Sequence, residues 1–154
     1  MDSHGRLWSE FGSLLQGLKD LNTHAIEATG LRLEPAGAHL LSRLSFLGSV
    51  RLTVLAGSLG LDPSSVSRQV TALEKAGLLA REEDPSDRRA TRLTLTSAGA
   101  DVVASLQQAR ARALHRLTPD WSDSDIDALA DRLARLNLDL EANRALLDAR
   151  LENA

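Results

Sequence analysis

Residues 52–77 read LTVLAGSLGLDPSSVSRQVTALEKAG, and this stretch decides the fold. A first short helix is predicted, with Thr53 as its N-cap and Gly60 as its end. Asp62 then suits the N-cap of a second helix, since Pro63 fits the first helical turn that follows it. Two helices separated by so short a turn predict a helix-turn-helix.

The second of these helices has two contrasting faces. Val66, Val70 and Leu73 recur at helical spacing, so we expect them to hold the helix against the core. The opposite face is hydroxylic and basic, which fits either an ordinary solvated surface or a DNA contact. On DNA, short hydroxyl side chains allow close approach to phosphates, and Arg68 can reach a guanine edge. The candidate DNA-binding residues of this helix are Ser64, Ser65, Ser67, Arg68, Gln69, Thr71 and Lys75.

A β-hairpin is predicted directly after the second helix. Residues 78–82 and 90–95 have the composition of short strands, and residues 83–89 between them are rich in turn-forming residues. Thr96 then suits the N-cap of a long helix. A hairpin in this place is typical of the wing in a winged helix-turn-helix.

The tip of this hairpin carries charges of both signs. Arg88 and Arg89 are further candidate DNA-binding residues, because planar cationic groups suit the negative potential of a narrow minor groove. Asp84 and Asp87 are predicted to pair with a tip arginine and to fix its direction. A charged hairpin taken alone is more often a solvated turn, so the DNA-binding interpretation depends on the preceding helices.

Helices are also predicted on both sides of the winged segment. The first ends near Gly30, a short second one runs from Pro35 to Gly48, and Ser122 suits the N-cap of the last. Both outer helices carry apolar stripes, and the heptad spacing of the last one suits packing along a partner helix. The first stripe comprises Leu7, Phe11, Leu14, Leu15, Leu18 and Leu21, and the last comprises Ile126, Leu129, Leu133, Leu136, Leu140 and Leu147, with Asn143 at one further position.

Composition sets the broad class. Hydrophobic residues make up 43% of the 154 residues but aromatic residues only 3%, so the core must be built mostly from Leu, Ala and Val. We therefore expect a mostly α fold with a small β-hairpin wing. The chain has no cysteine, no long apolar run and no signal-peptide pattern at its N-terminus, which predicts a cytoplasmic protein that does not enter a membrane. The net charge of −3 argues weakly against nucleic acid, although residues 51–95 are the least acidic segment.

Enzymatic and metal-sensing functions have little support. The four histidines, His4, His24, His39 and His115, are scattered along the chain. They form no short ligand motif, and no arrangement of nucleophile, base and orienting group is indicated. We expect no enzymatic activity, no cofactor and no metal site.

Several segments resemble the MarR family of bacterial winged-helix regulators. They are residues 55–56, 61–68 and 73–78, Arg81, and the segments 84–89 and 95–99. The resemblance implies a homodimer with intertwined first and last helices. It also implies that Arg89 enters the minor groove while Asp87 orients it, and that Glu74 pairs with Arg81.

The resemblance further implies the organisation and the function. A single MarR-like domain, residues 1–154, would contain a winged helix-turn-helix DNA-binding lobe, residues 35–99, and a helical dimerisation lobe, residues 1–30 and 100–154. The protein is expected to be a transcriptional regulator that binds a palindromic operator in double-stranded DNA, and repression is the commoner outcome in the family. Many members are released from DNA by small phenolic or carboxylate effectors.

Two alternatives stay open. Trp8, Phe11 and His39 are candidate lining residues for an effector pocket, and packing in the core is the other role for all three. The competing function is a winged-helix module that binds protein rather than DNA, since fold alone does not fix function. Such a module would more often carry apolar patches where this sequence has a hydroxylic and basic face.

Overall fold

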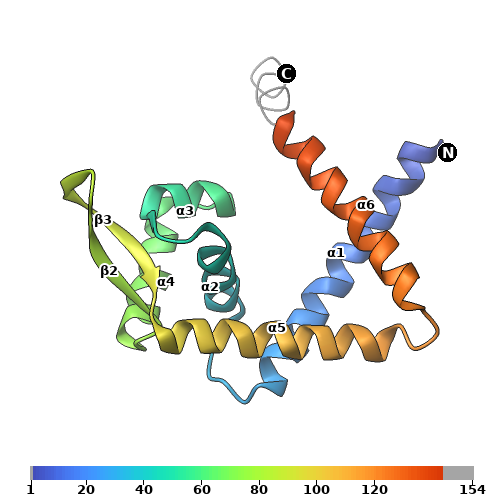
Figure 1. Cartoon of the computed structure of the whole chain (residues 1–154), viewed down its shortest axis with the longest axis horizontal. Helices are drawn as coiled ribbons and strands as arrows, with labels where there is room; N and C mark the ends of the chain where they lie inside the picture. The colour runs from blue at the N-terminus through green and yellow to red at the C-terminus, as the bar shows by residue number, and fades with distance from the viewer. Residues whose placement is uncertain (1, 144–154) are drawn as a thin grey trace. The chain divides into compact units, whose positions relative to one another are not determined.

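The structure, a computed structural model, describes residues 2–143 apart from the side chain of Arg88. Contacts divide the chain into two compact units, Met1–Leu114 and His115–Ala154. The fold is mostly helical with one small antiparallel sheet, which confirms the predicted fold class. The elements, labelled in Figure 1, are α1 (Ser3–Ala28), α2 (Pro35–Leu47), β1 (Val50–Arg51), α3 (Leu52–Leu59), α4 (Pro63–Lys75), β2 (Leu79–Asp84), β3 (Asp87–Leu95), α5 (Ser97–Leu117) and α6 (Asp123–Ala142).

The winged lobe is built around a core of leucine and valine side chains. Helices α2, α3 and α4 lie together beside the base of the β2–β3 hairpin (Figure 1). Val66, Val70 and Leu73 of α4 are at most 4% exposed, as their spacing predicts. Burying each such side chain contributes about 1.5–3 kcal/mol, so this face fixes the rotation of α4 and leaves its opposite face to solvent. The buried cluster comprises Leu40, Leu41, Leu44, Leu55, Ala56, Val66, Val70, Leu73, Leu79, Leu93 and Val103.

The sheet has a third strand that the sequence analysis missed. Strand β1 pairs with β3 in an antiparallel sense, placing Val50 opposite Leu93, and the strand order is β1-β3-β2. Because β1 runs straight into α3, Arg51 is the N-cap residue of that helix. The predicted cap at Thr53 is therefore wrong, and Thr53 lies inside the first turn.

The hairpin is longer than predicted. Strands β2 and β3 extend to Asp84 and Asp87, which leaves a tight turn through Pro85 and Ser86. The strand register shifts between Glu83 and Asp84, so the regular alternation of side chains is interrupted just before the turn.

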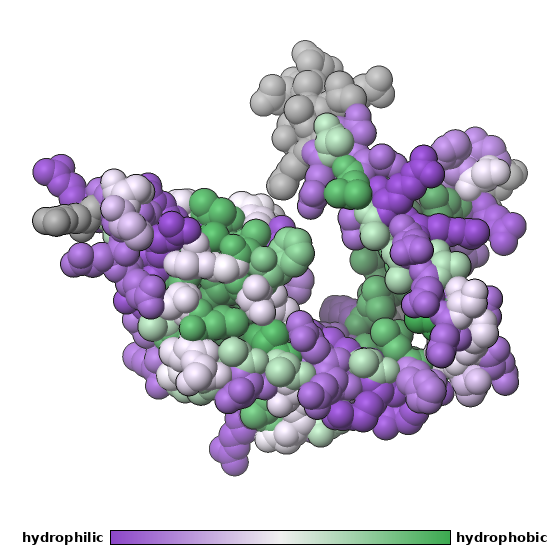
Figure 2. Space-filling view, in the orientation of Figure 1, coloured by the Kyte–Doolittle hydropathy of each residue, from purple (hydrophilic) through white to green (hydrophobic). Residues whose placement is uncertain are grey.

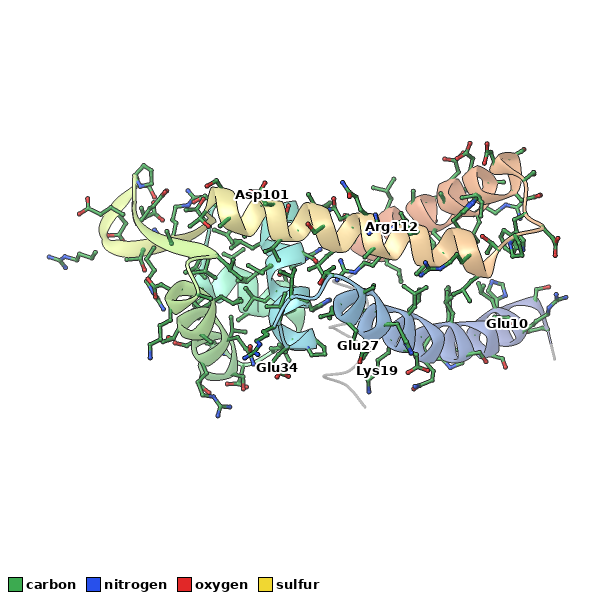
Figure 3. All side chains as sticks on the ribbon, turned by 90° about the horizontal axis from the view of Figure 1, so that it is seen from below. Glu10, Lys19, Glu27, Glu34, Asp101 and Arg112 are labelled. Atoms are coloured by element: carbon green, nitrogen blue, oxygen red, sulfur yellow. The ribbon has the colours of Figure 1, made fainter. Side chains whose placement is uncertain are left out.

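Only the C-terminal part of α1 is packed. Ala25 and Ile26 are its buried residues, and Ile26 joins Ala38 of α2 and Leu106 of α5 in a second small core. Figure 3 shows Lys19 on the side of α1 that points away from α5 and Asp101 on the far side of α5. Most apolar side chains of the earlier turns of α1 remain exposed, with Leu7 at 47% and Leu14 at 45%, whereas Phe11 is half-buried.

Helix α6 belongs to the second unit. It begins as predicted: Ser122 and Asp125 form a capping box in which each side chain binds the other residue's backbone nitrogen. Within the described residues the heptad stripe is only partly covered: Leu133 and Leu136 are half-buried, whereas Ile126 is 41% and Leu140 is 51% exposed. Asn143 caps the end of the helix. Leu147, the last predicted residue of the stripe, lies outside the described part of the chain.

Within residues 2–143, no helix combines the length and the apolar character that crossing a membrane requires.

Candidate nucleic-acid interface

The exposed face of α4 displays four of the side chains that the sequence predicts for DNA contact. Ser64, Arg68, Thr71 and Lys75 are all exposed. The hydroxyl of Thr71 donates to the carbonyl oxygen of Ser67 over 2.9 Å, which leaves the hydroxyl oxygen free to accept from a further partner. The face therefore combines short polar groups with two long cations.

The edges of this face are less accessible. Ser65, Ser67 and Gln69 are half-buried. Gln69 lies on the flank towards α2, where its Oε1 atom is 3.9 Å from the position that a Cβ atom on Gly37 would take. Of the seven candidates on α4, these three lie at the margin of the exposed face.

The start of α4 is firmly capped. The carboxylate of Asp62 accepts a hydrogen bond from the hydroxyl of Ser64 over 2.5 Å and another from the backbone nitrogen of Ser65 over 2.9 Å. These bonds hold the pKa of Asp62 well below its usual range. The negative charge at this end of the helix is thus engaged by the helix itself.

The wing tip is organised around Asp87. Its Oδ1 atom accepts from the backbone nitrogen of Arg89 over 3.0 Å, and its Oδ2 atom lies 3.8 Å from an Nη2 nitrogen of Arg51. The side chain of Arg89 is exposed. The predicted contact role of Arg88 concerns a side chain outside the described part of the structure.

Asp84 has a different partner from the one predicted. It is 3% exposed, and its Oδ2 atom accepts from Nε of Arg51 over 2.7 Å rather than from a tip arginine. Its Oδ1 atom accepts from both the hydroxyl and the backbone nitrogen of Ser86, over 2.6 and 2.9 Å. The bonds from Ser86 and Arg51 hold the pKa of Asp84 well below its usual range, and Asp84 in turn raises the pKa of Arg51. Because Arg51 lies 33 positions from Asp84, nothing in the local sequence identifies this pair.

The predicted ion pair at the base of the wing is confirmed. Nε of Arg81 on β2 lies 3.2 Å from a carboxylate oxygen of Glu74 on α4. The pair joins α4 to the hairpin, the two elements that carry the candidate DNA-binding residues. Since both side chains are partly exposed, its effect on stability is small and its effect on relative placement matters more.

The three predicted effector residues lie on the surface or at its margin. Trp8 is 79% exposed on α1, His39 is exposed on α2, and Phe11 is half-buried. The alternative that Trp8 and His39 pack in the core of their own chain is therefore wrong. Among the described residues, no group of three or more metal-ligating side chains comes together.

A polar cluster that the sequence analysis missed lies at Arg110 of α5. Its Nε atom donates to Oδ1 of Asn22 on α1 over 2.9 Å, and Nη1 donates to the hydroxyl of Ser42 on α2 over 3.1 Å. Burial lowers the pKa of Arg110. In the described part of the chain no carboxylate forms a salt bridge with this guanidinium. Its partners lie 88 and 68 positions away, which explains why no local motif signals it.

Known proteins share both the sequence and the fold. The sequence pattern of the MarR family matches residues 33–91. The uncharacterised helix-turn-helix transcriptional regulator YxaD of Bacillus subtilis is 35% identical over 105 residues, which cover 68% of this chain and 73% of YxaD.

Solved structures match over most of the chain. Apo MarR from E. coli is 20% identical with a TM-score of 0.72, covering 88% of this chain and 97% of that one. The Mycobacterium tuberculosis protein RV1404 is 25% identical with a TM-score of 0.75, covering 93% and 95%. The chain belongs to the MarR family of helix-turn-helix transcriptional regulators, which bind DNA and are not enzymes.

Proposed function

We propose that this protein represses transcription by binding a palindromic operator as a homodimer. In this proposal α4 of each subunit lies in a major groove and the wing reaches the adjacent minor groove. The observation that carries it is the exposed face of α4, where Arg68 and Lys75 stand among hydroxyl groups. A wing bearing exposed Arg89 belongs to the same lobe.

The acidic net charge does not oppose this proposal. Three carboxylates of the winged lobe already have partners: Asp62 is bound by the start of α4, Glu74 by Arg81 and Asp84 by Arg51. The cations Arg68, Lys75 and Arg89 are exposed. Local placement therefore favours an approach to phosphates, because attraction to DNA depends on the charges that face it.

The proposed homodimer is supported by the apolar surfaces of the outer helices. Leu15 of α1 is 69% exposed, and Leu129 of α6 is 44% exposed. Exposed apolar side chains arranged in stripes at helical spacing are typical of a helix that packs on another helix. A second copy of the chain is the proposed occupant, because a two-fold dimer would present two copies of α4 to one face of the duplex.

The competing function, a protein-binding winged helix, has weaker support. The exposed apolar side chains of the winged lobe include Phe46 of α2 at 75%, Val54 of α3 at 51%, and Leu61 in the turn before α4 at 51%. Figure 2 shows the wing as largely hydrophilic, with apolar residues gathered over α2 and α3. The wing and the exposed face of α4 are thus mainly polar, which favours DNA over a protein partner.

Selection from random DNA, followed by gel shift, tests the proposed function. We expect an inverted repeat with half-sites about 10 bp apart, bound more weakly as salt increases. Enrichment of no sequence at moderate salt contradicts DNA-specific binding and favours the protein-binding alternative. Enrichment of a sequence without two-fold symmetry contradicts the proposed dimer arrangement.

The proposal extends to release by a small carboxylate effector. The guanidinium of Arg110 is partly buried and is hydrogen-bonded only to neutral groups in the described part of the chain. It joins α1, α2 and α5, so an anion that draws it away from Asn22 and Ser42 would disturb the packing of α2. Benzoate is a suitable probe: it should raise the melting temperature of the parent protein, weaken operator binding, and do neither for Arg110→Met. An equal effect of benzoate on Arg110→Met contradicts this part of the proposal.

A further inference from the structure

Arg51 links three parts of the wing. It belongs to β1, and its Cα atom is paired with that of Arg92 on β3. From there the side chain reaches Asp84, the last residue of β2, over 2.7 Å, and approaches Asp87, the first residue of β3, at 3.8 Å. One guanidinium therefore holds both ends of the turn at the wing tip.

The carboxylates that receive Arg51 are themselves tied to the turn. Asp84 uses its other oxygen to accept from the hydroxyl and the backbone nitrogen of Ser86. Asp87 uses its other oxygen to accept from the backbone nitrogen of Arg89. A continuous chain of polar contacts thus runs from β1 through Asp87 to the backbone of the arginine that the proposed function sends into the minor groove.

We infer that Arg51 is a positioning residue for DNA binding, which fixes the direction of the wing tip so that Arg89 is already aligned with the minor groove. The inference rests on the proposed function. Arg51 itself need not touch DNA, because its effect is to reduce the conformational freedom that the tip loses on docking. Such preorganisation strengthens binding without adding a contact.

Arg92 provides a matched control. Arg51 and Arg92 line the same surface hollow of about 240 Å³, together with Val50, Val54, Asp84 and Ser86. The guanidinium of Arg92 donates to the carbonyl oxygen of Ser49, and thus binds the chain before β1. Replacing either arginine by glutamine removes one positive charge from the same hollow, but only Arg51→Gln releases the tip.

The first test follows the wing tip without DNA. Trypsin cleaves after Arg88 and Arg89, and cleavage there reports how often the tip opens. In the full chain, Arg51→Gln should raise the cleavage rate at these two bonds by about threefold or more, while Arg92→Gln should stay near the parent rate. Cleavage of Arg51→Gln at the parent rate would overturn the inference.

The second test is a double-mutant cycle on the selected operator. Arg51→Gln should weaken binding by about three- to thirtyfold, and much of this loss should disappear when Arg89→Ala is already present. With Arg68→Ala already present, the loss from Arg51→Gln should remain in full. A merely structural role predicts the same loss in both backgrounds, and that result rejects a positioning role acting through Arg89.

A conservative variant, Arg51→Lys, keeps the tests decisive if Arg51→Gln does not fold. Arg51→Lys keeps the charge but cannot contact both carboxylates with one planar group, so it should give intermediate values in both tests. If Arg51→Gln fails to fold, Arg51→Lys decides, and parent-like cleavage and binding by Arg51→Lys overturn the inference. If the parent protein selects no DNA, the proposed function fails, whereas the trypsin test still decides whether Arg51 holds the tip.

Discussion

The hydroxyl of Thr96 donates a hydrogen bond to the carbonyl oxygen of Gly77 over 2.7 Å. The hydroxyl oxygen of Thr96 also accepts a hydrogen bond from the backbone nitrogen of Gly99 over 3.0 Å. Thr96 therefore joins the turn after α4 to the first turn of α5, and its predicted capping role is confirmed. The helix proposed to read DNA and the long helix leading out of the winged lobe share this one side chain.

Thr96→Val should destabilise the protein. It removes the N-cap of α5 and leaves the carbonyl oxygen of Gly77 without this donor, so we expect a loss of about 1–2 kcal/mol in the free energy of unfolding. Ser97→Ala, at the exposed next position, is the control and should change stability by less than about 0.5 kcal/mol. Urea titration measures both variants, and equal stability of the two would show that the cap contributes nothing.

Gly99→Ala should destabilise the protein more than the addition of one methyl group to a helix usually does. A Cβ atom at Gly99 would lie 1.9 Å from the carbonyl oxygen of Leu78, so the backbone of α5 or of the preceding turn has to shift. We expect a loss of about 1–3 kcal/mol or more. Gly57→Ala in α3, where an added Cβ meets nothing within 4 Å, should instead stabilise by about 0.5–1 kcal/mol. Thermal unfolding that ranks the two variants in the opposite order contradicts this account.

Arg68→Ala and Arg89→Ala should weaken DNA binding in different ways. Arg68→Ala should abolish discrimination at one base pair of each half-site, at a cost of about 1–3 kcal/mol per bidentate contact. Arg89→Ala should weaken binding to many sequences and lower the salt slope by about 0.9 for each phosphate charge no longer neutralised. Fluorescence anisotropy over a range of salt, with operators altered at single base pairs, measures both effects.

These two variants also test the assignment of the surface. Both should remain folded dimers with the parent far-ultraviolet circular dichroism spectrum. If both bind the selected operator with the parent Kd, neither α4 nor the wing carries the DNA contact. A uniform loss from Arg68→Ala across all base pairs would assign it to phosphate rather than to a base edge.

Leu129→Glu should dissociate the proposed dimer. The change puts a charge into the apolar stripe of α6, and a buried, unpaired charge at a helix interface is costly. Leu138→Glu is the matched control, because Leu138 is 66% exposed and lies on the opposite side of α6 at about 100° per residue. Sedimentation equilibrium at micromolar concentration should show a monomer only for Leu129→Glu. A parent protein that is itself a folded monomer contradicts the two-groove arrangement.

Acid should destabilise the wing through Asp84. A carboxyl group whose pKa is lowered in the folded state contributes stability that is complete above its unfolded pKa, about 3.9, and is lost as the pH falls below it. Stability should therefore decline below about pH 4, and Asp84→Asn should flatten the decline. Urea titrations between pH 3 and 7 measure this. Parallel curves for the parent and Asp84→Asn would show that the contacts with Ser86 and Arg51 do not stabilise the charged form.

Local sequence is sufficient to predict those features of the fold that a single short segment determines. The start of α4 at Pro63 follows from the capping preference of Asp62 and the fixed backbone angle of proline. The buried face of α4 follows from periodicity alone. The pairing of Glu74 with Arg81 follows from the family resemblance and not from spacing, because a pair that joins a helix to a strand has no fixed separation in sequence.

The contacts of Arg51, by contrast, cannot be predicted from local sequence. A strand of two residues is too short to display an alternating pattern, so β1 has no sequence signature. Without β1, the sequence offers no partner for Asp84 other than the arginines of its own hairpin. The exposure of Trp8 does not follow from the sequence either, because an aromatic residue beside an apolar stripe predicts burial without indicating whether the same chain provides the cover.

The strand order also constrains how the lobe assembles. The β2–β3 hairpin closes locally, but the contact of Ser49 with Arg92 joins positions 43 residues apart, and the intervening chain contains α3 and α4. Closing a loop of that length lowers the entropy of the chain. This cost is offset only when the enclosed helices pack against the sheet. Formation of β1 and docking of the two helices should therefore be a single cooperative event in folding, with the hairpin formed first and its outer edge completed last.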